Sequence, residues 1–364
     1  GQIATPEVYR LLLRSPPDFN SINEKSLFRP LGKSLPNHPQ AVSLLLRVQD
    51  SPERNRAARE FARRVFGFAG VEILPELHEA LKSDDRVIRS NAARGCGSVG
   101  NRSSIPYLVD ALDLESGLSR ASIVWALGEL KAKQSIPHLV TLYIDARNDE
   151  KQRRGAGFRS AQSVAVYQSH FDSLRNLQSI GRDWSRLKQS LRAQPVDPRR
   201  NEELLSPHII LTAVSQIGSA SAQQFYRRLA ADREYEPRLE AAERLAEGGA
   251  LDKPRNVPVL RNLLADQWPD VRMRAAVSLL ILGDTFSQPQ ILAWLKSPND
   301  LDRLNMFMQL KRIEDGNQLT FAKEAIARAP LPDNPYQKSR NTELKQHLLK
   351  LIRNAAARRG TSRP

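Results

Sequence analysis

The chain has 364 residues, of which 40% are hydrophobic and 6% aromatic, and its 55 basic residues outnumber 40 acidic ones to give a formal net charge of +15. This composition excludes a disordered chain but is lean for one large core. The single cysteine, Cys96, excludes an intrachain disulfide and any cysteine-based zinc or iron–sulfur cluster. No run of about 18 apolar residues occurs, so we expect no transmembrane segment.

Residues 1–50 are predicted to be a proline-rich N-terminal segment with a capping helix. Six prolines fall within residues 1–40 and leave one short apolar helix candidate, Val8–Leu13. The chain begins with Gly1 rather than methionine, which leaves the compartment open. We expect a cytoplasmic location, with an extracytoplasmic one as the alternative.

Prolines recur every 31 residues within residues 51–146 and again within residues 203–330. They are Pro75, Pro106, Pro137, Pro258 and Pro289. Hydrophobic residues follow each proline by two and by six positions, which places both on one face of a helix. Upstream of most of them lies a second helical pattern with paired small residues, such as Ala92-Ala93, and with glycine near its end, where a left-handed C-cap is expected. We therefore predict a repeat of two helices, the second of which begins at the proline.

A polar residue stands two positions before three of these prolines, as Ser104, Ser135 and Asn256. We predict that these residues are N-caps, because a proline in the first turn of a helix loses no intrahelical hydrogen bond. The predicted fold class is all-α: a superhelical α-solenoid of about seven or eight helix pairs with a long helical insert.

The repeats resemble the HEAT-like repeats of the phycobilisome-lyase type. The resemblance rests on Asp85-Arg86-Val87-Ile88-Arg89, Ala92-Ala93, Gly97 and Ile105-Pro106-Tyr107-Leu108; on Ser119-Arg120, Ala126-Leu127-Gly128 and Ile136-Pro137-His138-Leu139; and on Trp268-Pro269-Asp270-Val271-Arg272, Ala275-Ala276 and Leu282-Gly283. It implies clear repeats over residues 52–145 and 235–297, and degenerate ones over 203–233 and 300–329. The resemblance implies a fold and says little about function.

Arginine recurs at one position of the repeat, 17 residues before a proline, as Arg89, Arg120 and Arg272. One interpretation is a ladder of cations along the groove. The other is structural: each guanidinium bonds an acidic residue or a helix end of the adjacent repeat. We favour the structural interpretation, because a residue that recurs with the repeat usually stabilises the repeat.

Residues 147–202 interrupt the repeats and are predicted to form a basic helical insert. From Tyr167 to Leu191 the apolar residues are spaced by three or four, which predicts one amphipathic helix of about 25 residues, roughly 40 Å long. We expect this helix to pack along the solenoid groove, and pairing with a partner helix is the alternative. Residues 331–364 are predicted to contain one last helix and a basic tail.

The excess positive charge is concentrated in the insert and near the C-terminus. Residues 147–200 hold 12 basic and 5 acidic side chains and residues 323–364 hold 10 and 3, whereas residues 201–322 hold 14 and 16. A uniformly basic groove, the signature of an array that follows a nucleic-acid backbone, is therefore absent. The candidates for binding a partner or an anion are Arg153, Arg154, Arg175, Arg182, Arg186, Arg192, Arg199, Arg200 and Trp184.

No residue is assigned to catalysis, to a cofactor or to a metal. The sequence contains no glycine-rich phosphate loop, nucleophile elbow or zinc signature. His78 precedes Glu79, a pair that the related di-iron deoxyhypusine hydroxylase repeats, but His138 and His208 lack the glutamate, so a di-iron centre lacks ligands. We expect His78 to be an exposed helix residue and Cys96 a buried small hydrophobe.

The predicted function is a non-catalytic protein–protein interaction scaffold that uses the solenoid groove and the basic insert, without a cofactor. The alternative is a nucleic-acid-binding solenoid that acts through the Arg-rich insert and tail, which would also suit another anionic surface. An enzyme similar to the alkylpurine DNA glycosylases or to the phycobilin lyases is the third candidate. The partner, the oligomeric state and whether the insert helix 167–191 covers the groove stay open.

Overall fold

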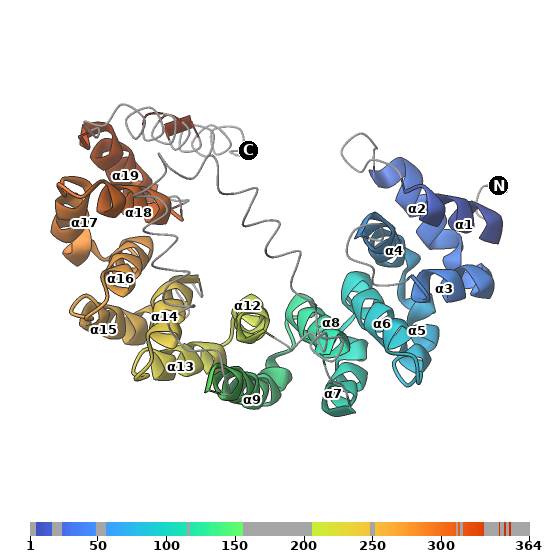
Figure 1. Ribbon diagram of the computed structural model, residues 1–364. Helices are drawn as coiled ribbons and strands as arrows, with labels where there is room; N and C mark the ends of the chain where they lie inside the picture. The colour runs from blue at the N-terminus through green and yellow to red at the C-terminus, as the bar shows by residue number, and fades with distance from the viewer. Residues whose placement is uncertain are drawn as a thin grey trace, which may run out of the picture. The chain divides into compact units, whose positions relative to one another are not determined.

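A computed structural model describes residues 5–16, 24–48, 56–114, 117–155, 206–247, 252–310, 312–313, 316–330, 342, 346 and 349–350. The chain divides into two compact units, Gly1–Ile217 and Gly218–Pro364, drawn in Figure 1 from blue to red along the sequence. Over the residues just given, the regular secondary structure is helical and includes no strand. The prediction of an all-α solenoid is confirmed.

Unit 1 is built from ten α-helices among the described residues. They are α1 (Pro6–Arg14), α2 (Glu24–Ser34), α3 (Pro39–Leu46), α4 (Arg56–Ala69), α5 (Leu74–Ala80), α6 (Arg86–Val99), α7 (Ile105–Leu114), α8 (Gly117–Glu129), α9 (Ile136–Gly155) and α12 (Pro207–Ile217), with 3-10 turns η1 (Leu35–Asn37), η2 (Val71–Ile73), η3 (Arg102–Ser104) and η4 (Lys133–Ser135). Each of η2, η3 and η4 leads directly into a helix that has proline at its second position.

The helices of unit 1 form two rows. We name α3, α5, α7 and α9 the A row and α4, α6, α8 and α12 the B row (Figure 1). Each A helix packs against the B helix that follows it, and each B helix packs against the next B helix. The predicted repeat of paired helices is therefore present in this unit.

Unit 2 repeats the same arrangement. Its helices are α13 (Ala220–Leu229), α14 (Tyr235–Glu247), α15 (Lys253–Leu263), α16 (Pro269–Ile281), α17 (Gln288–Leu295), α18 (Asp300–Leu310) and α19 (Gly316–Arg328), with the 3-10 turn η7 (Thr285–Ser287) before α17. The pairs are α13/α14, α15/α16 and α17/α18, so that α14, α16 and α18 form the B row of this unit.

Helices α2 and α3 were not expected from the sequence. Helix α2 contains Pro30 in its interior, which is why its residues do not read as helical. It buries Phe28 and Leu31, and it packs against α4 as α1 packs against α3. The proline-rich N-terminal segment thus extends both rows of unit 1.

Small residues bring neighbouring B helices close together, as predicted. A Cβ atom added at Gly97 would lie 2.8 Å from Trp125 and 3.0 Å from the Ala126 Cα, so α6 and α8 are in backbone contact there. Gly100 adopts the predicted left-handed C-cap with a φ of 76°. The corresponding left-handed residue after α8 is Lys131 rather than Gly128, because Gly128 packs against α12.

The predicted N-caps before the prolines are wrong. Ser104 and Ser135 end the 3-10 turns and are completely buried, and Asn256 lies inside α15 and is also completely buried. The Ser135 hydroxyl donates to the Ala132 carbonyl, and the Asn256 amide donates to the Leu245 carbonyl. These side chains satisfy carbonyl groups of the turn or the preceding helix instead of helix N–H groups.

The predicted insert begins within a repeat of unit 1. Helix α9 continues to Gly155, and α12, which begins at Pro207, packs against α9. These two helices therefore complete one pair although about 50 residues separate them in sequence. The predicted helix 167–191 and most of the predicted C-terminal helix lie outside the described residues.

Candidate interaction surfaces

The structure describes few of the predicted binding residues. Arg153 and Arg154 lie in the last turn of α9, where only the backbone is described. The remaining candidates lie outside the described residues: Arg175, Arg182, Arg186, Arg192, Arg199, Arg200 and Trp184. Their roles stay a prediction, and the surfaces below come from other residues.

Two of the three recurring arginines, Arg89 and Arg272, stabilise the turn between the A and B helices of their own repeat. Arg89 donates to the Ser83 carbonyl at 2.6 Å, and Arg272 donates to the Asp266 carbonyl at 2.7 Å. Arg238 and Arg303 donate in the same way to the carbonyl six residues upstream. Arg89 and Arg272 are thus structural, but the predicted partners in the adjacent repeat are wrong, because these bonds are made within the repeat. Among the described residues, the Nε of Arg120 is buried without a hydrogen-bond partner, so its role stays a prediction.

One turn arginine also connects neighbouring repeats. Arg238 of α14 forms a two-pronged ion pair with Asp266, which precedes α16, at 2.6 and 3.2 Å. Burial raises the pKa of Asp266, but hydrogen bonds from Arg238 and from the Trp268 amide lower it further, so the pKa lies below its ordinary value. The bond fixes α14 and α16 relative to each other.

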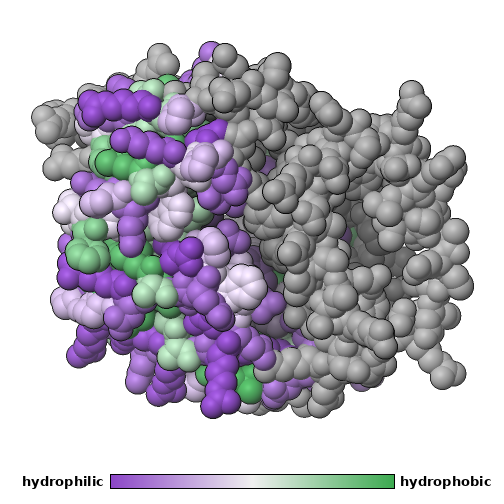
Figure 2. All heavy atoms as spheres, turned by 60° about the vertical axis from the view of Figure 1, so that its left-hand side comes forward, coloured by the Kyte–Doolittle hydropathy of each residue, from purple (hydrophilic) through white to green (hydrophobic). Residues whose placement is uncertain are grey.

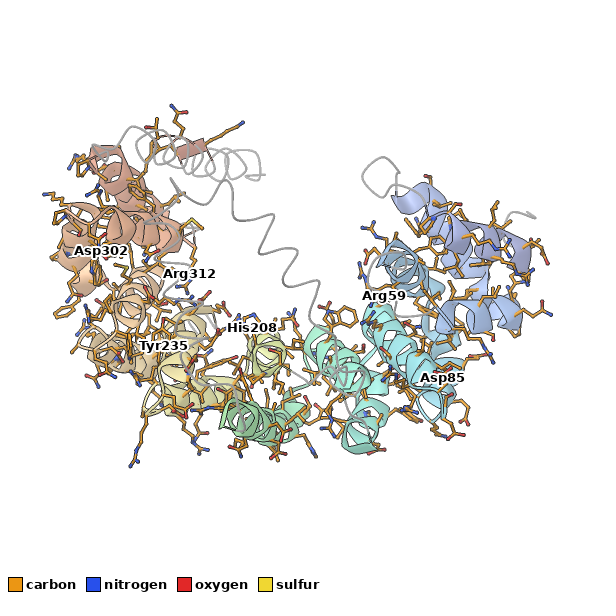
Figure 3. All side chains as sticks on the ribbon, in the orientation of Figure 1. Arg59, Asp85, His208, Tyr235, Asp302 and Arg312 are labelled. Atoms are coloured by element: carbon orange, nitrogen blue, oxygen red, sulfur yellow. The ribbon has the colours of Figure 1, made fainter. Side chains whose placement is uncertain are left out.

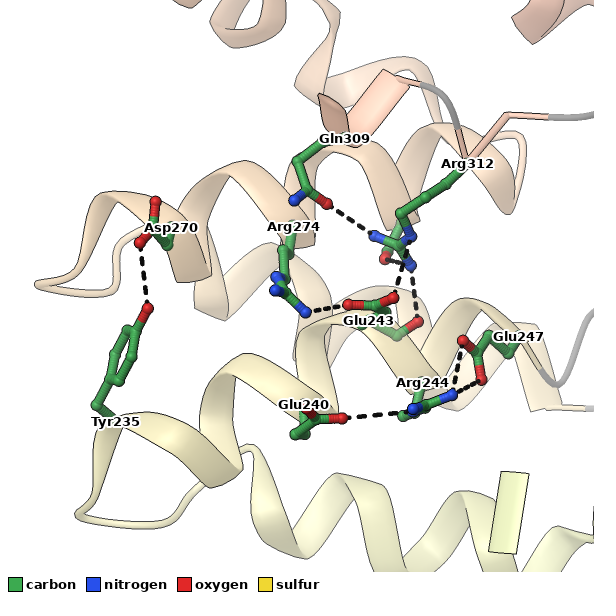
Figure 4. Close-up of polar contacts among 10 residues, drawn as sticks. Tyr235, Glu240, Glu243, Arg244, Glu247, Asp270, Arg274, Gln309 and Arg312 are labelled. Atoms are coloured by element: carbon green, nitrogen blue, oxygen red, sulfur yellow. Dashed lines mark hydrogen bonds and ion pairs between the residues drawn. The ribbon is translucent and has the colours of Figure 1, made fainter. Parts of the chain in front are cut away.

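A cluster of charged side chains joins all three B helices of unit 2 (Figure 4). We name it the charged cluster, and it consists of Glu240, Glu243, Arg244 and Glu247 on α14, Arg274 on α16 and Arg312 just beyond α18. Glu243 pairs with both Arg274 and Arg312. Arg244 pairs with Glu240 and Glu247 on its own helix.

Arg312 is held on several sides (Figures 3 and 4). Its guanidinium donates to the Glu243 carbonyl at 3.0 Å, to the Ser278 hydroxyl at 3.3 Å and to Gln309 at 3.4 Å, and its side chain is 19% exposed. Burial lowers the pKa of Arg312, although Glu243 raises it.

An exposed methionine lies on α18, the B helix that ends just before Arg312. Met308 is 46% exposed in the last turn of this helix, which ends at Leu310. Methionine adapts its shape to a partner and is common at docking surfaces. In the view of Figure 2, hydrophobic side chains form small patches among hydrophilic ones. The B row of unit 2 thus combines fixed charges with an apolar contact point.

The B row of unit 1 is also joined by polar contacts. The Ser90 and Ser122 hydroxyls are 2.7 Å apart between α6 and α8, and Arg94 donates to Ser122 at 3.0 Å. Between α8 and α12, Gln216 donates to Glu129 at 3.4 Å. These contacts fix neighbouring helices, so the exposed side chains of this row have defined positions.

A pair of aromatic rings lies at the A-to-B turns of unit 2, and sequence reasoning missed it. The rings of Tyr235 and Trp268 are 5.1 Å apart at 58°, and the Tyr235 hydroxyl donates to Asp270 at 3.1 Å (Figure 4). Trp268 is 46% exposed. We name Tyr235, Trp268 and Asp270 the aromatic edge. Its members come from adjacent repeats that are 34 rather than 31 residues apart at this point, which hides the pairing in the sequence.

His78 is not the exposed residue that was predicted. Its ring stacks on Tyr107 at 3.8 Å and 14°, and its Nε2 lies 2.9 Å from the Ser104 hydroxyl. Burial lowers the pKa of His78, which favours the neutral imidazole. The prediction for Cys96 is confirmed, because its side chain is buried and burial raises the pKa of the thiol to about 11.

A shallow hollow of about 520 Å³ lies between α15 and the turn before α17. It is lined by Lys253, Pro254, Val257, Pro258, Arg261, Gly283, Asp284 and Thr285. Within the described ranges, no three His, Cys, Asp or Glu side chains come together as a metal site would need. No helix in those same ranges has both the length and the apolar character to cross a membrane.

Residues 74–156 match the family model for HEAT repeats. This match covers α5 to α9, the pairs whose geometry is given above. This part of the chain carries HEAT-like repeats. The expected resemblance is confirmed, and the fold is that of a HEAT-like repeat scaffold in general. No curated protein matches the chain.

Solved structures with similar folds include proteins of different function. One is the complex of CpcE and CpcF of phycocyanin lyase from Nostoc sp. PCC7120, with 19% identity and a TM-score of 0.35 over 85% of this chain and 94% of that one. Another is human deoxyhypusine hydroxylase, with 17% identity and a TM-score of 0.26 over 88% and 99%. A third is an engineered protein, with 14% identity and a TM-score of 0.28 over 96% and 95%.

Proposed function

We propose that this HEAT-like chain is a non-catalytic scaffold that binds a protein partner through its B-row faces, with the basic insert as a second contact. The observation that carries the proposal is the B row of unit 2, where α18 exposes Met308 and the side chains of the charged cluster are already held by one another. Such side chains lose little conformational freedom on binding, which favours association.

The basic insert supports the proposal through its charge. Residues 147–200 hold 12 basic and 5 acidic side chains, and Arg153, Arg154, Arg175, Arg182, Arg186, Arg192, Arg199 and Arg200 are the proposed contacts, together with Trp184. Arginine binds carboxylates in a planar, two-pronged geometry, so an acidic patch on the partner suits this segment. The same charge would suit nucleic acid, and the experiment below separates the two.

The experiment captures partners from native extract on the immobilised chain, with and without nuclease. We expect a protein that is retained after nuclease treatment and whose capture falls at least about fivefold in Met308→Glu, because a buried charge opposes docking. Leu292→Glu is the matched control: Leu292 is an exposed hydrophobic residue of the same unit, but it lies on α17 of the other row.

Two results would contradict the scaffold. Loss of the captured protein after nuclease treatment would show that nucleic acid connects it to the chain. A fall in affinity of about a thousandfold or more between about 50 and 200 mM salt would indicate phosphate binding by six or more of the arginines. A second chain in which a Gly/Ser linker replaces residues 156–205 measures the part played by the insert, since this replacement leaves the α9/α12 pair intact.

A further inference from the structure

The aromatic edge of unit 2 combines two features that recognise a cation. Trp268 exposes nearly half of its surface, and Asp270 lies two residues further along with its carboxylate fixed by the Tyr235 hydroxyl. The face of an indole ring attracts a cation, and a carboxylate still accepts several hydrogen bonds after taking one from tyrosine. Exposed Glu236 lies next to Tyr235 and adds a further negative charge.

Another site in unit 2 shows which group binds an aromatic ring and a neighbouring carboxylate together. Elsewhere in unit 2, the Arg261 guanidinium lies over the Phe286 ring at 4.9 Å and pairs with Asp284 at 2.7 Å. There too, the aromatic ring and the carboxylate are two residues apart in sequence. An arginine therefore satisfies an aromatic ring and a neighbouring carboxylate at once, because its flat guanidinium stacks and donates in plane.

We propose that the aromatic edge binds an arginine side chain in a basic segment of a protein partner. The guanidinium stacks on Trp268 and donates to Asp270, and Glu236 attracts the neighbouring basic residues. This proposal rests on the scaffold function and names the chemistry of the partner at a surface remote in sequence from the insert. Lysine fits less well, because its ammonium neither stacks nor donates in a two-pronged geometry.

The local charge favours a basic partner although the whole chain is basic. Residues 201–322 hold 14 basic and 16 acidic side chains, so this part of the chain carries a small net negative charge. Charges further away than about 8 Å are largely screened at physiological salt. Within this distance Glu236 and Asp270 attract an approaching arginine, while the Arg272 guanidinium, which donates to the Gln267 carbonyl next to Trp268 at 3.0 Å, is the cation that they must outweigh.

The test measures binding of a fluorescently labelled peptide of alternating glycine and arginine to the full chain by anisotropy. We expect saturable binding that weakens about two- to fivefold in Trp268→Ala, in line with an exposed cation–π contact, and by a similar factor in Asp270→Asn. Trp268→Phe should recover part of the affinity, since it keeps an aromatic face. Phe286→Ala is the matched control, because its exposed ring is already covered by Arg261.

Three results would overturn the proposal. The first is that a peptide with glutamate in place of arginine binds the chain as tightly as the arginine peptide does. The second is that Trp268→Ala and Asp270→Asn, with melting temperatures equal to that of the parent chain, bind the arginine peptide as tightly as the parent chain does. The third is that the arginine peptide binds only after residues 156–205 or 331–364 are removed. The last result would mean that a basic segment of the chain occupies the edge. If the arginine peptide does not bind but the chain still captures a protein in a way that depends on Met308, this proposal is wrong and the proposed scaffold function is unaffected.

Discussion

Adding one methyl group at Gly32 should destabilise unit 1, because helix α2 rests directly on the backbone of α4 at this residue. A Cβ at Gly32 would lie 2.5 Å from the Phe68 Cβ, 2.6 Å from the Phe68 carbonyl carbon and 2.7 Å from the Val65 carbonyl oxygen. Ordinary van der Waals contact begins at 3.4 Å, so the two helices must separate by almost 1 Å in Gly32→Ala. The obstacle is backbone, which cannot rotate away as a side chain can.

The expected cost combines two opposing effects. Overpacking of a well-packed interface costs about 1–3 kcal/mol, and backbone contact places this site in the upper half of that range. Alanine in a helix is favoured over glycine by about 1 kcal/mol, which offsets part of the cost. Gly32→Ala should therefore lower the free energy of unfolding by about 1–2 kcal/mol.

Gly67 provides the matched control on the facing helix. A Cβ there would meet its nearest atom, the Ser98 carbonyl oxygen, at 3.5 Å, which is an ordinary contact. Gly67→Ala should be neutral or stabilise by up to about 1 kcal/mol. Urea unfolding followed by circular dichroism compares the variants, and hydrogen exchange shows whether the loss of protection in Gly32→Ala centres on α2 and α4. If Gly32→Ala is as stable as Gly67→Ala, the close packing of α2 on α4 is refuted.

Two further predictions concern ionisable groups. The pKa of Asp266 is lowered in the folded chain, so the stability it contributes is present above the ordinary carboxyl pKa and is lost as the pH falls through the lowered value. Asp266→Asn should therefore lower the free energy of unfolding by about 1–3 kcal/mol at pH 7. Between about pH 5 and pH 3, the free energy of unfolding should fall less steeply in this variant than in the parent chain, as measured by urea unfolding. Because burial raises the pKa of the Cys96 thiol to about 11, a thiol reagent at pH 8 should react slowly with the native chain and quickly in urea. Fast labelling of the native chain would contradict the burial.

The repeat could be predicted from the sequence because equivalent positions of each helix pair make the same kind of packing contact. The proline spacing predicted where α5, α7, α9 and α17 begin, and the paired small residues predicted where B helices touch. For Pro258 the prediction is wrong, because α15 begins at Lys253 and contains this proline in its interior. Ala92 and Ala93 are completely buried in α6, as the pattern requires. The turn arginines were recognised by recurrence alone, but their partners are backbone carbonyls, which no sequence pattern identifies.

The wrong predictions share a physical cause: a contact with another helix outweighs the local sequence preference. Pro30 suggests a helix end, yet α2 continues through it while packing on α4. Ser104 before Pro106 suggests an N-cap, yet η3 turns it inward toward His78. Local signals give the correct element only where the neighbouring helix does not supply a stronger interaction.

The candidate surfaces were less predictable than the fold for a related reason. The charged cluster gathers Glu243, Arg274 and Arg312 from residues 31 and 38 positions apart, and none of them stands out in sequence. The aromatic edge likewise needs Tyr235 and Trp268 to come from adjacent repeats. Surface pairs of this kind depend on the stacking of repeats and become visible only in three dimensions.

The separation of charge along the sequence follows from where the insert enters the solenoid. Helices α9 and α12 pack as a pair although about 50 residues separate them, which places the insert in an A-to-B turn. Each repeat is stabilised by contacts with its neighbours, and the entropic cost of a longer loop grows only with the logarithm of its length. A long basic segment can therefore be added at this turn without changing either row. The rows then keep nearly balanced, mutually paired charges that fix their geometry, while the insert carries an excess of 12 basic over 5 acidic residues.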